Sequence, residues 1–358
     1  MEFPDGWTDP LAALPEIPRH PSISSEDESP LPSVFPSPQL AEDLEGKASR
    51  ALRNYTPISP TDDTKDVLAI FLEHLSTQGQ MVLMAEIDQF AADPPKLRML
   101  RNFLVDAILK PMKLGGGKSP SIEPTPDLEA AQDIGLSMTT IESFRNEQRK
   151  MKDDCAKRDD HRCVVTGCVD REHFRELPSG LRQGLTPGEL EYAHIFPFAL
   201  RKFDERGSLE TEKKATIWWA LHRYFSFIKD GIHAGTINKR ENGMTLYHTI
   251  HRDFGGFLLA LRPLGQDNRY RCHVFDDLGY MASHIPTTVT LVQHDPSVPM
   301  PDPNLLRVHF QIAKILHVSG IGLKIDSVWN EDKSWSAYNP NIAPDGSTDI
   351  SMRFLGSC

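Results

Sequence analysis

The sequence predicts an α+β protein, and two kinds of pattern point to this class. Apolar residues recur at helical spacing in three segments, residues 66–75, 96–109 and 305–318. Short apolar runs that are typical of strands occur in residues 192–198, 257–261 and 270–275. Helices are therefore expected towards both ends of the chain, with most strands between them, and no internal repeat is evident.

The first 60 residues have the composition of a disordered tail. They contain 11 of the 28 prolines, mixed with serines and acidic residues such as Glu26, Asp27 and Glu28. Such a segment cannot bury enough apolar surface to offset its chain entropy. A small helical segment is expected over residues 62–112, and a glycine- and proline-containing flexible linker over 113–140.

The largest predicted unit covers residues 141–285. A helix over 141–157 leads into its strands, and a second helix over 211–228 is inserted between them. The tryptophans of this insertion, Trp218 and Trp219, are interpreted as core residues, with stacking on DNA as the alternative. A strand and helix extension over 286–325 and an irregular tail over 326–358 complete the chain.

Three residues in this unit suggest phosphodiester chemistry. His194 lies in a short apolar strand, Asn242 follows 48 positions later, and His251 lies nine positions beyond Asn242. Hydrolysis of a phosphodiester requires a base that activates water and a cation that stabilises the phosphate and the leaving oxygen. A strand would fix His194 on one face, and a helix starting just after Asn242 would present His251 towards that strand.

Three neighbouring side chains are further candidates for the site. Glu191 would share a strand face with Ala193 and reach a metal, although a solvated carboxylate explains it equally well. His248 lies one helical turn before His251, so it is a candidate ligand or phosphate contact. Arg252 is either a phosphate contact through its forked donors or a solvated residue that completes the helix dipole.

In their order along the chain, four motifs resemble a fungal-type subfamily of the HNH endonucleases. They are Cys163-Val164-Val165-Thr166-Gly167, Tyr192-Ala193-His194-Ile195, Asn242, and His251-Arg252-Asp253-Phe254-Gly255. The resemblance implies a ββα-metal (His-Me finger) core with a helical insertion. It also implies that His194 is the base, that Asn242 clamps the loop, and that His251 binds one divalent metal, Mg²⁺ or Mn²⁺. Many HNH enzymes carry Asp or His directly before the base, where this chain has Ala193, so Glu191 becomes the candidate second ligand.

Composition limits the compartment and the cofactors. The five cysteines contain no pair of Cys-x-x-Cys motifs, which argues against a structural zinc and fits a reducing compartment. The first residues lack the basic and apolar regions of a secretory signal, and no apolar run is long enough to span a bilayer. We therefore expect an intracellular protein, nuclear or cytoplasmic and not secreted, with no membrane partner.

The charge distribution bears on nucleic-acid binding. The net charge of −11 argues against it, but residues 1–60 carry a balance of −6 and residues 142–262 a balance of +3. The sequence thus predicts a metal-dependent endonuclease that hydrolyses DNA, with RNA also open and no protein partner indicated. Ala193 favours the alternative, an inactive HNH fold kept as a nucleic-acid or protein interaction module. A chance resemblance is the third interpretation.

Overall fold

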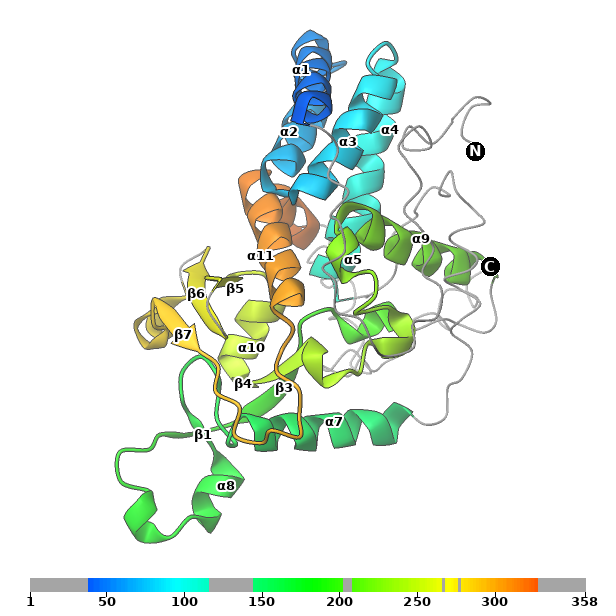
Figure 1. Ribbon diagram of the computed structural model, residues 1–358. Coiled ribbons are helices and arrows are strands. Elements are labelled where there is room, and N and C mark those ends of the chain that lie inside the picture. The colour runs from blue at the N-terminus through cyan, green and yellow to red at the C-terminus, as the bar shows by residue number, and fades with distance from the viewer. Residues whose placement is uncertain (1–37, 116–143, 202–207, 266–267, 276–277, 328–358) are drawn as a thin grey trace, which may run out of the picture.

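The computed structural model of the chain describes residues 38–115, 144–201, 208–265, 268–275 and 278–327. The N-terminal helices gather at one end of the molecule, the short strands lie at the other end together with further helices, and α11 (Pro303–Val318) lies between the two regions (Figure 1). Most of the buried apolar residues of both regions belong to one continuous cluster. This mixture of helices and small sheets agrees with the predicted α+β class.

The N-terminal helices lie where the apolar spacing predicted them, with one addition. They are α1 (Pro38–Asn54), α2 (Thr64–His74), α3 (Thr77–Gln89), α4 (Pro94–Leu104), a π-helical turn (Val105–Leu109) and α5 (Lys110–Lys113). Helix α1 overlaps the segment that was expected to be disordered, so from Pro38 onwards that expectation is wrong. Ala48, Ala51 and Leu52 of α1 are buried, which gives this part of the chain the apolar burial that its composition did not suggest. Residues 1–37, and the expected linker beyond residue 115, lie outside the described residues.

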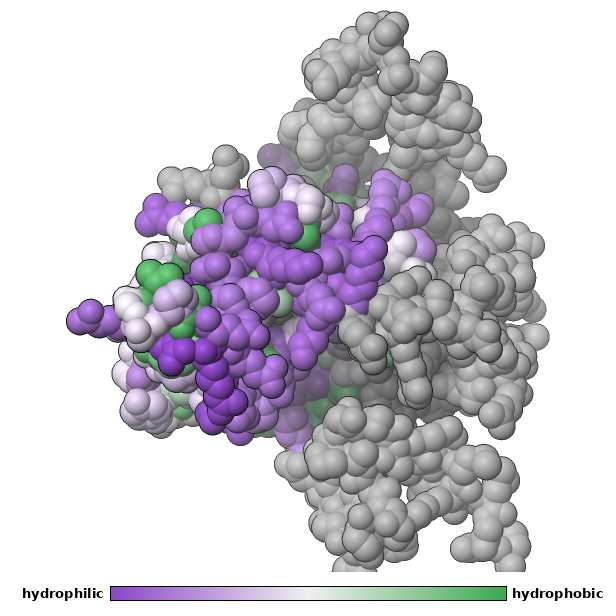
Figure 2. All heavy atoms as spheres, turned by 90° about the horizontal axis from the view of Figure 1, so that it is seen from below, coloured by the Kyte–Doolittle hydropathy of each residue, from purple (hydrophilic) through white to green (hydrophobic). Residues whose placement is uncertain are grey.

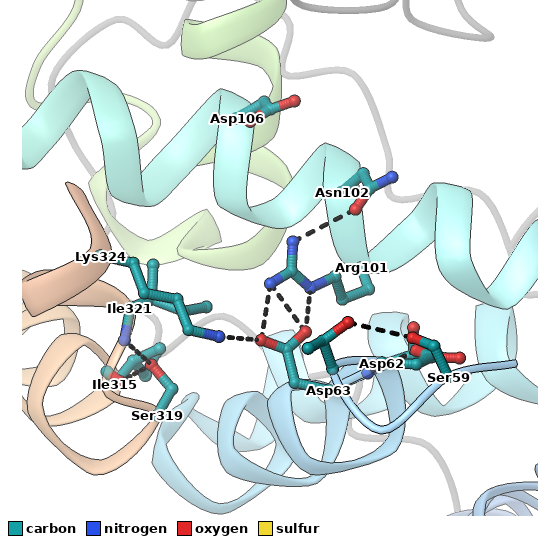
Figure 3. A network of polar contacts seen from close by, with 12 residues as sticks. Ser59, Asp62, Asp63, Arg101, Asn102, Asp106, Ile315, Ser319, Ile321 and Lys324 are labelled. Atoms are coloured by element: carbon teal, nitrogen blue, oxygen red, sulfur yellow. Dashed lines mark hydrogen bonds and ion pairs between the residues drawn. The ribbon is translucent and has the colours of Figure 1, made fainter. Parts of the chain in front are cut away.

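A polar network fastens this helical region at the start of α2. Arg101 of α4 donates from Nε and Nη2 to the two carboxylate oxygens of Asp63, at 2.7 and 2.9 Å. Lys324, from the helical residues that follow α11 (Pro303–Val318), donates to Asp63 Oδ2 at 2.7 Å (Figure 3). One carboxylate therefore joins three segments that are far apart in the sequence.

The inserted helix is present as α9 (Ser208–Tyr224), and it connects the two regions. Its Tyr224 hydroxyl donates to the buried carboxylate of Glu86 on α3 at 2.6 Å, and Arg223 Nε donates to the same carboxylate at 2.9 Å. Gly79 allows the close approach of the two helices, because a Cβ atom there would lie 2.2 Å from the Tyr224 carbonyl oxygen. Trp218 and Trp219 are both buried, so the interpretation as core residues is confirmed.

Two small sheets follow α7 (Phe144–Arg158). Strands β1 (Val169–Asp170) and β2 (Pro187–Gly188) pair in parallel around α8 (Arg171–Glu176), and β3 (Leu190–His194) pairs antiparallel with β4 (Gly243–Tyr247). Helix α10 (His248–Gly255) follows β4 directly. The expectation that a helix starts just after Asn242 is therefore wrong. Asn242 precedes a strand, whose Met244, Thr245 and Leu246 are buried, and the helix begins at His248, after the five strand residues.

The third sheet has the antiparallel order β5 (Leu259–Pro263), β6 (Arg269–Val274) and β7 (Thr288–Thr290). Strands β5 and β6 and helix α11 confirm the patterns in residues 257–261, 270–275 and 305–318. Six short 3-10 turns complete the described structure: Ser179–Leu181, Phe198–Arg201, Ser226–Ile228, Ala234–Thr236, Arg240–Asn242 and Gly279–His284.

Figure 2 shows the molecule from below the view of Figure 1, on the side of α7 and α8, and the described surface on this side is predominantly hydrophilic. Within the described ranges, no helix has both the length and the apolar character needed to cross a membrane.

Candidate nuclease site

A buried ion pair holds β4 in place from the side opposite β3. Arg158, at the end of α7, is fully buried and binds Asp159 through Nε and Nη2 at 2.7 and 3.0 Å. Its remaining donors reach backbone carbonyls, including that of Gly243 at 2.9 Å, and Asp159 Oδ2 accepts the Thr245 amide at 2.8 Å. This network satisfies backbone groups at the free edge of β4.

Asn242 connects the end of β3 to the start of β4. Its Oδ1 accepts the Phe196 amide at 2.8 Å, and its Nδ2 donates to the carbonyls of Phe196 at 3.1 Å and Ile237 at 2.8 Å. The side chain is fully buried. Beyond the ends of β3 and β4, the Asn242 side chain therefore takes the place of a backbone hydrogen-bond partner. It fixes the segment directly after His194.

Glu191 meets both histidines of α10. Its two carboxylate oxygens lie 2.9 Å from His248 Nδ1 and 2.5 Å from His251 Nδ1. Glu191 lies opposite Leu246 in the strand pair, and α10 packs against β3, so the strand face of Glu191 and Ala193 is directed at this helix. Partial burial raises the pKa of Glu191. The hydrogen bonds and the charges of His248 and His251 lower it by a larger amount, so the net shift of the pKa is downward.

His194 occupies a different environment at the end of β3. Strand alternation places it with Tyr192, on the face opposite Glu191, and the two rings meet edge to face at 4.8 Å between centroids. Phe198 covers it from the other side at 5.4 Å, and Asn238 Oδ1 lies 3.4 Å from its Nε2. Burial lowers the pKa of His194 to about 4, with a smaller contribution from the charge of His251, so its imidazole is neutral at pH 7.

Arg252 stands apart from these groups. Its side chain is 71 % exposed, and its polar contact is with the neighbouring Asp253, at 3.3 Å. The structure thus brings together Glu191, His248 and His251. Among the described contacts, His194 is connected to this cluster through the electrostatic influence of His251.

Sequence reasoning missed Asn238 and the Arg158–Asp159 pair. Asn238 is buried, and its Nδ2 has no hydrogen-bond partner within the described part of the chain. No motif marks this residue, because its contact with His194 spans 44 positions. Arg158 and Asp159 were visible only as charged residues next to the Cys163 motif, and nothing local indicated their burial.

The donor set near α10 suits a metal only in part. Across the described ranges, no group of three or more His, Cys, Asp or Glu side chains is arranged to hold a metal ion. Glu191, however, contacts the Nδ1 atoms, which leaves Nε2 of His248 and His251 as the nitrogens that can bind one. A carboxylate that accepts a hydrogen bond from one ring N–H orients the other ring nitrogen towards a metal in many metalloproteins.

Comparison with known proteins agrees with this description. Residues 163–262 match a family model described as HNH endonuclease, a span that contains β3, β4, α9 and α10 together with all six candidate residues. Neither a curated protein nor a solved structure matches the chain. The similarity to HNH endonucleases is thus confined to residues 163–262, and the helices of residues 38–115 and α11 lie outside the matched span.

Proposed function

We propose that this protein is a metal-dependent endonuclease that hydrolyses phosphodiester bonds of DNA. One observation carries the proposal: within the segment that matches HNH endonucleases, two antiparallel strands and a helix bring Glu191 against His248 and His251. Imidazole and carboxylate groups on facing elements can together orient and hold a metal ion beside a scissile phosphate.

His194 is assigned as the general base. Its lowered pKa keeps the imidazole neutral, which is the form that accepts a proton from water. The Oδ1 atom of Asn238 accepts hydrogen bonds only, so this contact favours a proton on His194 Nε2 and leaves Nδ1 as the basic nitrogen. Asn242 fixes the backbone that follows His194, and thereby the position of the ring.

A divalent ion, Mg²⁺ or Mn²⁺, would be held by His251, with His248 as the further donor. When bound, such an ion stabilises negative charge on the phosphate and on the leaving oxygen. Glu191 is proposed to orient both imidazoles rather than to bind the metal directly, because its oxygens already accept from their Nδ1 atoms. Arg252, exposed at the same helix, is available for a phosphate oxygen of the substrate.

Plasmid cleavage tests this proposal. Supercoiled DNA is incubated with the full-length protein in Mg²⁺, Mn²⁺ or EDTA, beside His194→Ala and a control, His284→Ala, which removes an exposed histidine outside the matched segment. We expect metal-dependent cutting that is lost in His194→Ala and kept in His284→Ala. Absence of cutting by folded protein in every metal, with DNA still bound in EDTA, would contradict the proposal and indicate a binding module with an inactive site.

A further inference from the structure

One face of the β5–β6–β7 sheet gathers positive charge. Arg262 on β5 lies directly opposite Arg271 on β6, and strand alternation places His273 on the same face. Both arginines are exposed. Like charges directly opposite each other destabilise a strand pair, so the Arg262–Arg271 pair does not contribute to the stability of the sheet.

Helix α11 adds to this charge from one side. The Arg262 guanidinium lies 5.9 Å from the centroid of the Phe310 ring, and the His273 ring lies 4.7 Å from the same ring. Burial lowers the pKa of His273, and the charges of Arg262, Lys314 and Arg271 lower it further. The charges of Arg262, Arg271 and Lys314 therefore all reach the His273 ring, and we name these four residues the basic sheet face: Arg262, Arg271, His273 and Lys314.

Acidic residues do not compensate this charge in the described structure. None of the described strand residues on this face is acidic, and no described carboxylate forms an ion pair with Arg262, Arg271 or Lys314. His273 Nε2 is buried and has no hydrogen-bond partner among the described residues. In a chain of net charge −11, arginines that lack an acidic partner among the described residues favour a site for an anionic ligand.

The location favours nucleic acid as that ligand. Strand β5 follows α10 closely in the sequence and packs against it, and in Figure 1 the sheet stands beside this helix. The matched HNH segment ends at Arg262, so Arg271, His273 and Lys314 lie beyond it. Arginine forks bind phosphate oxygens in pairs, and a duplex presents phosphates in regular rows.

We propose that the basic sheet face binds the phosphate backbone of a nucleic-acid duplex next to the HNH unit. This inference rests on the proposed nuclease function for the choice of partner. It adds a backbone-binding surface built mainly from residues outside the matched domain. The contacts would position the duplex without reading its sequence.

Fluorescence anisotropy with a labelled DNA duplex in EDTA tests the surface without any need for cleavage. The full-length protein is compared with the double variant R271T/K314Q and with a charge-matched control, R53Q/K65Q, on the exposed faces of α1 and α2. We expect weaker binding by R271T/K314Q only. The slope of log affinity against log salt concentration should become shallower by about 2, one for each lost phosphate contact.

The variant also provides its own folding control. Replacing Arg271 by threonine removes a like-charge pair, so thermal unfolding of the single variant R271T should occur at the same or a higher temperature. Unchanged DNA binding and salt slope in R271T/K314Q would overturn the inference, as would an equal loss in the control variant. A loss of affinity for a peptide of residues 1–37, with DNA binding unchanged, would assign the face to an acidic protein segment and also overturn it.

The two proposals fail separately. If His194-dependent cleavage occurs but the R271T/K314Q variant binds and cuts normally, the basic sheet face is wrong and the nuclease stands. If no cleavage occurs while DNA binding depends on Arg271 and Lys314, the surface stands and the nuclease activity is wrong.

Discussion

Asn242 holds both backbone polar groups of Phe196: its Oδ1 accepts the amide at 2.8 Å and its Nδ2 donates to the carbonyl at 3.1 Å. Phe196 lies two residues after His194, where strand pairing has ended. One amide side chain thus substitutes for the next pair of strand hydrogen bonds, and it does so with the complementary geometry of a peptide group.

Asn242→Ala should destabilise the protein strongly. The change leaves the buried Phe196 amide and the carbonyls of Phe196 and Ile237 without this partner, at about 1–3 kcal/mol for each unsatisfied group. Chemical denaturation measures the loss. Asn54→Ala, at an exposed position at the end of α1, is the matched control and should change the free energy of unfolding by less than about 0.5 kcal/mol. Equal effects of the two changes would contradict the assigned role of Asn242.

Arg158→Gln and Arg162→Gln should differ sharply although both arginines bind an aspartate. The Arg158–Asp159 pair is buried and tied to β4, whereas the Arg162 and Asp160 side chains are 36 % and 43 % exposed. Breaking the buried pair leaves an uncompensated charge and should cost about 3–5 kcal/mol. Breaking the exposed pair should cost below about 1 kcal/mol. Urea unfolding of the two variants decides this, and a similar midpoint for both would show that burial does not control the energy here.

Glu191→Gln should weaken metal binding without removing a direct ligand. The neutral amide cannot orient His248 and His251 as the carboxylate does, and loss of such a partner reduces metal affinity about 10–100-fold. Isothermal titration with Mn²⁺, one of the two proposed ions, gives the affinity directly. Glu189→Gln changes a carboxylate that is 73 % exposed two residues earlier and should leave the affinity unchanged. Equal affinities for wild type and Glu191→Gln would remove Glu191 from the site.

His309 should make the fold sensitive to acid. It is fully buried between the rings of Phe254 and Phe257, and its Nε2 donates to the Phe254 carbonyl at 3.1 Å. Burial lowers its pKa from 6.5 to about 3. The unfolded chain takes up a proton below pH 6.5 while the folded chain does not, so the stability from neutral His309 is complete above that pH and is lost as the pH falls towards 3.

Between pH 6.5 and 3, the free energy of unfolding should fall by about 1.4 kcal/mol per pH unit because of His309. His309→Gln has no titrating ring, so the difference in unfolding free energy between it and the wild type should shrink as the pH falls from 6.5. Denaturation series at pH 7, 6, 5 and 4 measure this difference, which also cancels the contributions of other histidines. A constant difference across the series would show that the pKa of His309 is the same in the folded and the unfolded chain.

Sequence patterns located many of the helices and strands. The spacing of apolar residues placed α2, α4, α9 and α11, and strand-like runs placed β3, β5 and β6. These predictions succeeded because each depends on periodicity within a single segment. Two local expectations failed: residues 38–54 form a helix despite their polar composition, and Gly243–Tyr247 forms a strand because it pairs with β3, which lies 49 or more positions earlier.

The sequence by itself determined the order of His194, Asn242 and His251 and the matched domain that contains them. Only the tertiary structure decided their surroundings: that Glu191 joins His248 and His251, that Asn238 reaches His194, and that Arg262 faces Arg271. The physical reason is that these contacts depend on strand register and helix packing. Both arise from burial of the whole core and leave no mark in the local pattern of residues.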